Sequence, residues 1–361
     1  MKYDPREIRV GDKIDIAPIG QVEVIQKFPS WNRLVLLVRR VDGVELVIKF
    51  FSFRDVPASL INWESLRIIQ NHIHDYKQAL RTARVFTSKG VGFAIKETIN
   101  HESVLIQWED YLGATCSAGI KEQPESVVVA IVEGILRCAV QPLFDNAPDP
   151  FNPGNVIVGL DLNPRNLTWQ KDDQDGTITV YVIDLFPPKI WDPHEKIHKL
   201  EFPEPNDPLV RELGFLRHFK MFGLILNLWT NLAKVRPNMA RIFYDQIETF
   251  LRTKGFAEVE RQLDEYLLEE IPGINSGDNL LIIGSWPVEK IKRIIERWGF
   301  KEIFKLRALA CAIAFQKNGS QELLEQIFTE SHFQNNKLEQ RQITRVGDLI
   351  IAMANKPSNG K

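Results

Sequence analysis

Cysteine is scarce in this chain, and there is no excess of charge of one sign. The three cysteines among 361 residues are an odd number, and Cys138 and Cys311 stand in apolar surroundings, so buried reduced thiols are expected and a disulfide framework is excluded. A formal net charge of -2 excludes a global electrostatic attraction to nucleic acid or to anionic membranes. Reduced thiols are typical of the cytoplasm, which is the expected location.

Long hydrophobic runs are also missing. Residues 1–5 are followed by charge rather than by an apolar stretch, and the longest apolar segment, at 221–229, is too short to cross a bilayer. Neither secretion nor membrane insertion is therefore expected, and neither nucleic acid nor membrane is an expected partner. The oligomeric state has no signal in the sequence. With 44% apolar and 25% charged residues, the composition is that of a globular protein.

Strand patterns dominate the first 112 residues. Asp42-Gly43 predicts a tight hairpin turn, because glycine readily takes the positive φ that such a turn needs. Apolar residues recur at spacings of three and four over 59–84, which predicts one amphipathic helix. A hinge is expected at 112–115. The expected strands are 21–28, 33–41, 44–51, 92–97 and 103–111.

Beyond residue 113 the pattern becomes helical. Residues 126–144 are apolar nearly all round, which predicts a buried helix. Six prolines make 186–208 an extended connector, and from residue 210 four or more amphipathic helices are expected before a polar tail.

Two carboxylates and an amide stand close together in the middle of the chain. Asp161 and Asn166 are followed, after a polar turn at 171–176, by an apolar strand at 177–183 that ends in Asp184. One carboxylate can accept or orient a substrate hydroxyl, while an amide and a second carboxylate suit Mg²⁺ bound to phosphates. The same residues also suit ordinary turns, since Asp and Asn side chains hydrogen-bond to nearby backbone.

This pattern resembles the catalytic loop and metal-binding aspartate of the aminoglycoside phosphotransferase and protein kinase superfamily. There an Asp, four further residues and an Asn precede a short hairpin and a second Asp. The resemblance implies that Asp161 is the catalytic base and that Asn166 and Asp184 hold Mg²⁺. It also implies that ATP is the phosphoryl donor and that Arg165 offsets charge developing in the transition state.

The superfamily uses a sheet lysine to hold the ATP phosphates, and Lys49 is placed to match it. It is the one charge within 47–51, a segment that is apolar on both faces, so it needs an anionic partner if buried. Glu64 is the expected partner, because it interrupts the apolar stripe between Leu60 and Ile68 of the following helix. Alternatively, Lys49 extends from an edge strand to solvent and Glu64 lies at the margin of the helix face.

Several features of the superfamily are missing. Residues 27–33 contain no glycine, so side chains such as Ser30 or Arg33 would bind phosphate in place of a backbone cradle. Gly159 stands where a histidine is common, Asp184 is followed by Leu-Phe-Pro-Pro, and no Ala-Pro-Glu segment follows. These differences argue against a regulated eukaryotic-type protein kinase. They leave open a catalytically inactive, kinase-like nucleotide-binding module.

A third function is suggested by the His-Glu-x-x-His pattern of zinc peptidases, in which two ligands lie one helical turn apart. His194, Glu195 and His198 match it. The segment is polar and lies between prolines, so a short solvated helix capped by Asp192 is the simpler interpretation.

As a whole, the sequence predicts an α+β, two-lobed protein-kinase-like fold, with a small antiparallel-sheet N-lobe carrying one helix and a larger, mainly helical C-lobe. The expected boundaries are 1–112 for the N-lobe, 113–355 for the C-lobe and 356–361 for a flexible tail. The expected function is transfer of phosphate from ATP, with Mg²⁺, to a hydroxyl of a small-molecule acceptor. Adenine would bind the backbone of residues 107–111.

Overall fold

The structure is a computed structural model of the chain. It describes residues 5–28, 33–51, 62–98, 103–199, 207–271, 273–274, 278–298, 302–317, 321–332 and 339–357.

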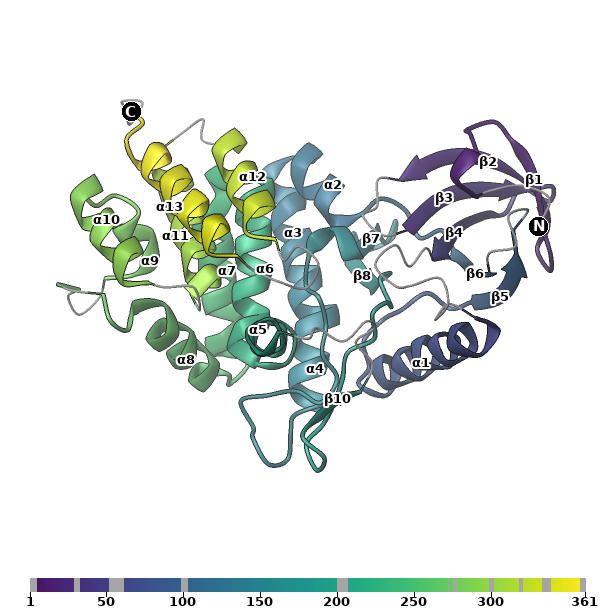
Figure 1. Cartoon of the computed structure of the whole chain (residues 1–361), viewed down its shortest axis with the longest axis horizontal. Helices are drawn as coiled ribbons and strands as arrows, with labels where there is room; N and C mark the ends of the chain where they lie inside the picture. Colours follow the sequence, from purple (N-terminus) through teal and green to yellow (C-terminus); the bar gives the residue numbers. More distant parts are fainter. Residues whose placement is uncertain are drawn as a thin grey trace.

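A six-stranded antiparallel sheet lies at one end of the molecule and most of the helices lie at the other (Figure 1). Its strand order is β1-β2-β3-β4-β6-β5. The five expected strands are confirmed, and β1, which is only four residues long, is an addition. Gly43 has a φ of +86° in the turn between β3 and β4, as expected for the hairpin. The strands are β1 (Lys13–Ile16), β2 (Gly20–Phe28), β3 (Arg33–Arg40), β4 (Glu45–Phe51), β5 (Val91–Glu97) and β6 (Ser103–Asp110).

The two faces of the sheet bury different sets of side chains, because successive residues of a strand point in opposite directions. One face holds an apolar cluster that includes Val38, Ile48 and Ile106. On the other face, Phe51 joins the large core that continues into the helical part of the protein. Lys49 is two residues from Phe51 and therefore shares this second face.

Helix α1 (Trp63–Thr82) packs on that second face and begins with a capping box at Asn62. The predicted helix is confirmed, but a different stripe of it is buried. Ile68 is 48% exposed, and Glu64, four residues away on the same side of the helix, is exposed as well. The buried side chains are Leu66, Ile69, Ile73, Tyr76, Lys77 and Leu80.

The remaining chain forms two short hairpins and a stack of helices (Figure 1). The hairpins are β7 (Leu167–Lys171) with β8 (Ile178–Val182) and β9 (Ile190–Asp192) with β10 (Ile197–Lys199). The helices are α2 (Cys116–Glu122), α3 (Glu125–Ile135), a π-helical turn (Leu136–Val140), α4 (Gln141–Asn146), α5 (Pro208–Phe219), α6 (Met221–Val235), α7 (Ala240–Thr253), α8 (Ala257–Leu268), α9 (Leu280–Ile283), α10 (Val288–Arg297), α11 (Ile303–Gln316), α12 (Gln321–Glu330) and α13 (Gln340–Ala354).

Among the residues that the structure describes, one helical stretch, Glu125–Asn146, is long and apolar enough to cross a membrane by length and composition alone. It runs through α3, the π-helical turn and α4, and it is longer than the apolar segment at 221–229 that the sequence singled out. Most of it lies inside the protein, since 61% of its most apolar window is buried. The predicted buried helix is thus confirmed, and burial accounts for its apolar composition.

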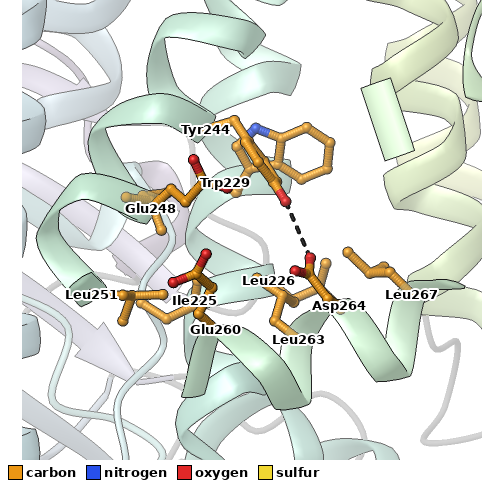
Figure 2. A pocket seen from close by; sticks show the side chains of 11 residues that line it. Ile225, Leu226, Trp229, Tyr244, Glu248, Leu251, Glu260, Leu263, Asp264 and Leu267 are labelled. Carbon is orange, nitrogen blue, oxygen red and sulfur yellow. Dashed lines mark hydrogen bonds between the residues drawn. The ribbon is translucent and has the colours of Figure 1, made fainter. Parts of the chain in front are cut away.

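A pocket between α6, α7 and α8 contains carboxylates among apolar side chains (Figure 2). Glu248, Glu260 and Asp264 share it with leucine and isoleucine residues. The Tyr244 hydroxyl donates a hydrogen bond to Asp264 Oδ1 at 3.3 Å. Burial is the main cause that raises the pKa of Asp264 and of Glu248.

Asp264→Asn should stabilise the protein near pH 7 and have little effect near pH 4. Because its pKa is raised, Asp264 favours the folded state when protonated, and this contribution is lost as the pH rises through the raised pKa. Asparagine removes the cost of ionisation, and its amide oxygen can still accept from Tyr244. We expect a gain below about 1 kcal/mol, because the group is partly exposed to solvent. The measurement is urea unfolding at both pH values.

The control is Asp245→Asn, which changes an exposed carboxylate already paired with Arg241. It should give no gain near pH 7. Equal destabilisation by Asp264→Asn at both pH values would contradict the raised pKa of Asp264.

Candidate functional site

Ile183 connects three of the predicted site residues. Its N–H donates a hydrogen bond to the backbone carbonyl of Asn166 at 3.0 Å. Its own carbonyl accepts a hydrogen bond from Lys49 Nζ. Asp184 is the next residue, so it is fixed close to both Lys49 on the sheet and Asn166 on its loop.

The loop of Asp161 and Asn166 is held by local hydrogen bonds. Asn163 accepts from the Arg165 N–H through its side chain at 3.2 Å and from the Asn166 N–H through its carbonyl at 2.8 Å, which forms the 3₁₀ turn Pro164–Asn166. Asn166 is buried, with Nδ2 3.5 Å from the Asp161 carbonyl, while Arg165 is exposed. Turn formation therefore accounts for Asn163, and the side chains of Asp161 and Asn166 are left for chemistry.

The Asp161 carboxylate lies in a positive environment. Burial is the largest influence on its pKa and would raise it, but Arg217 and Lys189 together with a hydrogen bond from Asn227 outweigh burial and lower it. Asn227 Nδ2 donates to Asp161 Oδ1 at 3.0 Å. Asp161 is therefore ionised at neutral pH, with its orientation set by α6.

The predicted pair of Lys49 with Glu64 is wrong. Lys49 is buried, 6% exposed, and its ammonium group forms an ion pair with Glu109 on β6. Ser88 Oγ donates to the other oxygen of Glu109 at 2.8 Å. Lys49 Nζ has three donors, of which Glu109 and the Ile183 carbonyl take two, so one is left for a ligand.

The partner was missed because it comes from a strand distant in sequence. Strand β4 pairs with β6, where Lys49 stands opposite Gln107 and Val47 opposite Glu109. Lys49 and Glu109 are thus diagonal neighbours on one face of the sheet, within reach of each other's long side chains. A carboxylate near the end of a largely apolar strand, Glu109 in β6, was the available signal, but the sequence does not say which strands are neighbours.

Tyr76 and Gly159 were also missed as parts of the site. The Tyr76 hydroxyl, from α1, donates to the Gly159 carbonyl at 2.8 Å, two residues before Asp161. The pKa of Tyr76 is well above its usual value, first through burial and then through the nearby charges of Asp184 and Asp161. A side chain at position 159 would bring Cβ to 2.6 Å from the His218 carbonyl, so the histidine common in the superfamily does not fit here.

The phosphate-binding and adenine-binding predictions stay predictions. Ser30 lies outside the described residues, and Arg33 is placed only by its backbone, opposite Phe51 in β3. Gln107 and Glu109 belong to β6 and are buried, and the chain leaves that strand at Asp110.

The His-Glu-x-x-His segment is not helical, so the zinc-peptidase interpretation and the short helix are both corrected. His194 and Glu195 lie in the turn of the β9–β10 hairpin, where their N–H groups donate to Asp192 Oδ1 at 3.0 and 3.3 Å. His198 belongs to β10, so the two histidines are not one helical turn apart. Within the described ranges, no group of three or more His, Cys, Asp or Glu side chains could hold a metal ion.

No protein family profile matches this chain, and no curated protein matches it in sequence. Among solved structures, WaaP in complex with acyl carrier protein is 13% identical, with a TM-score of 0.33, over 66% of this chain and 88% of that one. Vaccinia related kinase 3 is 10% identical, with a TM-score of 0.38, over 91% and 94% of the two chains. A MAP kinase from Leishmania major is 10% identical, with a TM-score of 0.37, over 92% and 94%.

At these identities and TM-scores, the fold and the site rest on the chain's own elements and contacts alone. The chain has a sheet with one packed helix, then a loop, a hairpin and a stack of helices. The chain is therefore α+β, and its elements follow the order predicted from the sequence, with Lys49 on the sheet and with Asp161 and Asp184 flanking the hairpin.

Proposed function

We propose that the protein transfers a phosphoryl group from ATP, with Mg²⁺, to a hydroxyl of a small-molecule acceptor in the cytoplasm. The observation that carries the proposal is the junction at Ile183, which links Lys49, Asn166 and the following Asp184. A cation for phosphate, two oxygen ligands for a metal and the Asp161 carboxylate are the parts that phosphoryl transfer requires.

The residues fit Mg²⁺. The Asn166 amide and the Asp184 carboxylate offer oxygen ligands, and Mg²⁺ in phosphate-handling sites usually takes one or two carboxylates, the rest of its shell being phosphate and water. When bound, Mg²⁺ would neutralise charge on the phosphates. The last free donor of Lys49 would contact the same phosphates, held in place by Glu109.

In the transfer step, an acceptor hydroxyl oxygen forms a bond to the γ-phosphorus while the bond from that phosphorus to the β,γ-bridging oxygen breaks, and ADP leaves. Asp161 accepts the hydroxyl proton. Because its pKa is low, it acts mainly by orienting the hydroxyl, and it takes the proton late in the step. Arg165 would offset negative charge on the transferred group.

A catalytically inactive nucleotide-binding module is the second candidate. It is favoured by the contacts of Lys49, two of whose three donors are taken by protein groups. Turnover of ATP with Mg²⁺ in the presence of candidate acceptors separates it from an enzyme.

Thermal unfolding with ATP and Mg²⁺ tests the nucleotide site. At 100 times its dissociation constant, a ligand that binds only the folded protein adds about 2.7 kcal/mol, which is several degrees in the midpoint. We expect a rise that requires both ATP and Mg²⁺ and that disappears in Asp184→Asn. Asp173→Asn, in the exposed turn between β7 and β8, should retain the full rise. No rise in the unmodified protein would sink the proposal.

A further inference from the structure

Four cationic side chains lie close enough to influence one another, and two of them, Arg217 and Arg307, also lie near Asp161. They come from the Asp161 loop, α5, α6 and α11. We call them the basic cluster, and they are Arg165, Arg217, Lys234 and Arg307.

Helix α6 connects Asp161 to Lys234. Asn227 donates to Asp161, and Asn231, one turn further, donates through Nδ2 to Asn227 Oδ1 at 3.0 Å. Lys234 is seven residues after Asn227, which places it on the same face of the helix about 10 Å along the axis. A polar row therefore leads from the carboxylate to the amine.

Helix α11 brings Arg307 close to Lys234. Lys234 Nζ lies 5.2 Å from the centre of the Phe328 ring, and the guanidinium carbon of Arg307 lies 5.4 Å from the same centre. Arg307 is 8% exposed and donates to Oγ and the carbonyl of Ser331, at 2.7 and 2.6 Å, both of them neutral groups. Two cations thus share one aromatic ring, and one of them is buried.

Arg217 approaches Asp161 from α5. Arg217 Nε donates to His218 Nε2 at 2.8 Å, and the His218 carbonyl accepts from the Leu160 N–H at 3.3 Å, next to Asp161. Burial, and after it the charge of Arg217, lower the pKa of Arg307 to about 9.

Lys234 is influenced by the other cations as well. Burial is the main cause that lowers its pKa, followed by Arg165 and Arg307. The fields of all four members of the basic cluster therefore overlap.

Among the described residues, the nearby carboxylates are fewer than these cations: Asp161 lies near Arg217 and Arg307, and Glu325 lies near Lys234. Within the described part of the chain, none of the four forms an ion pair, whereas arginines of α7 and α8 pair with Asp245, Glu260 and Glu258. Glu325 raises the pKa of Lys234, but its carboxylate accepts a hydrogen bond from Gln321. An excess of positive charge that forms no ion pair, with one of its members buried, is costly unless a further anion joins it.

We propose that the acceptor carries a phosphate group besides its hydroxyl, as a sugar phosphate does, and that Lys234, Arg307 and Arg217 bind this group. The inference rests on the proposed function, because it places the acceptor hydroxyl at Asp161. Arginine suits the role, since its planar fork matches two phosphate oxygens, and a dianion would offset several of the cations at once.

The test uses inorganic phosphate as the probe, without ATP, in isothermal titration calorimetry and thermal unfolding. We expect phosphate to bind the unmodified chain and Asp184→Asn equally, and sodium chloride of the same ionic strength to give no rise in midpoint. Lys234→Gln should weaken phosphate binding at least tenfold. Arg307→Gln should do the same if it folds, and the half-buried Lys234 keeps the test valid if it does not. Arg241→Gln, at an exposed ion pair of α7, is the matched control and should bind normally.

Absence of phosphate binding, or binding that Lys234→Gln leaves unchanged, overturns the inference. Loss of phosphate binding in Asp184→Asn also overturns the inference, because it would place the phosphate in the nucleotide site. If ATP with Mg²⁺ still stabilises the protein in either case, the proposed function stands without the phosphorylated acceptor. If both ligands fail to bind, both proposals fail.

Discussion

Asp161→Asn should reduce phosphoryl transfer by about 100- to 10,000-fold while leaving the binding of ATP and Mg²⁺ unchanged. Asparagine keeps an oxygen for the hydrogen bond from Asn227 Nδ2, so the loop should keep its shape. What is lost is the charge that orients the acceptor hydroxyl and receives its proton. The measurement is the release of ADP with an acceptor found by screening, alongside thermal unfolding with ATP and Mg²⁺.

The control is Asp173→Asn, which changes an exposed carboxylate in the turn after β7. Its rate should equal that of the unmodified protein. A rate for Asp161→Asn within about threefold of normal would show that Asp161 takes no part in the step. Loss of nucleotide binding in the same variant would show a structural role in place of a chemical one.

Glu109→Leu should destabilise the protein by about 3–5 kcal/mol, because it leaves the charge of Lys49 buried without an anionic partner. It also removes the acceptor of Ser88. Adding Lys49→Met should recover most of the loss, since an apolar pair of similar volume is often as stable as a buried ion pair. Urea unfolding of the single and double variants measures both effects.

Glu64→Gln is the matched control, because it alters the carboxylate first expected to pair with Lys49. Glu64 is exposed, so the free energy of unfolding of the Glu64→Gln variant should differ from that of the unmodified protein by less than about 0.5 kcal/mol. If Glu64→Gln destabilised the protein as much as Glu109→Leu, the helix and not β6 would hold the lysine. Both members of the observed pair lie on adjacent strands, so the pair does not depend on the position of α1.

The local pattern of apolar residues was enough to predict the strands and the helix on which the site is built. Segments rich in Val, Ile, Leu and Phe identified β2, β3 and β4, and apolar spacing of three and four identified α1. Both signals depend only on near neighbours in the chain. The loop of Asp161 and Asn166 could be recognised for the same reason, because its residues are adjacent in sequence. Strand β1 was missed, since four residues are too few for a period to be distinguished.

Contacts between distant segments could not be predicted in the same way. The face that α1 buries passes through Leu66, because the sheet covers that side of the helix. The His194 segment became a hairpin because its flanking residues pair as β9 and β10. Both outcomes depend on which segments meet, and helical spacing alone carries no information about that.

The sequence by itself determined the order of strands and helices, the Asp161–Asn166 loop, the strand before Asp184 and a sheet lysine that needed an anion. Only the tertiary structure decided that Glu109 is that anion and that Arg217, Lys189 and Arg307 lie near Asp161. Backbone periodicity is set by neighbours a few residues apart, so it can be read along the chain. Electrostatic partners are set by distance in space, and here they come from elements up to 146 positions apart, from Asp161 to Arg307.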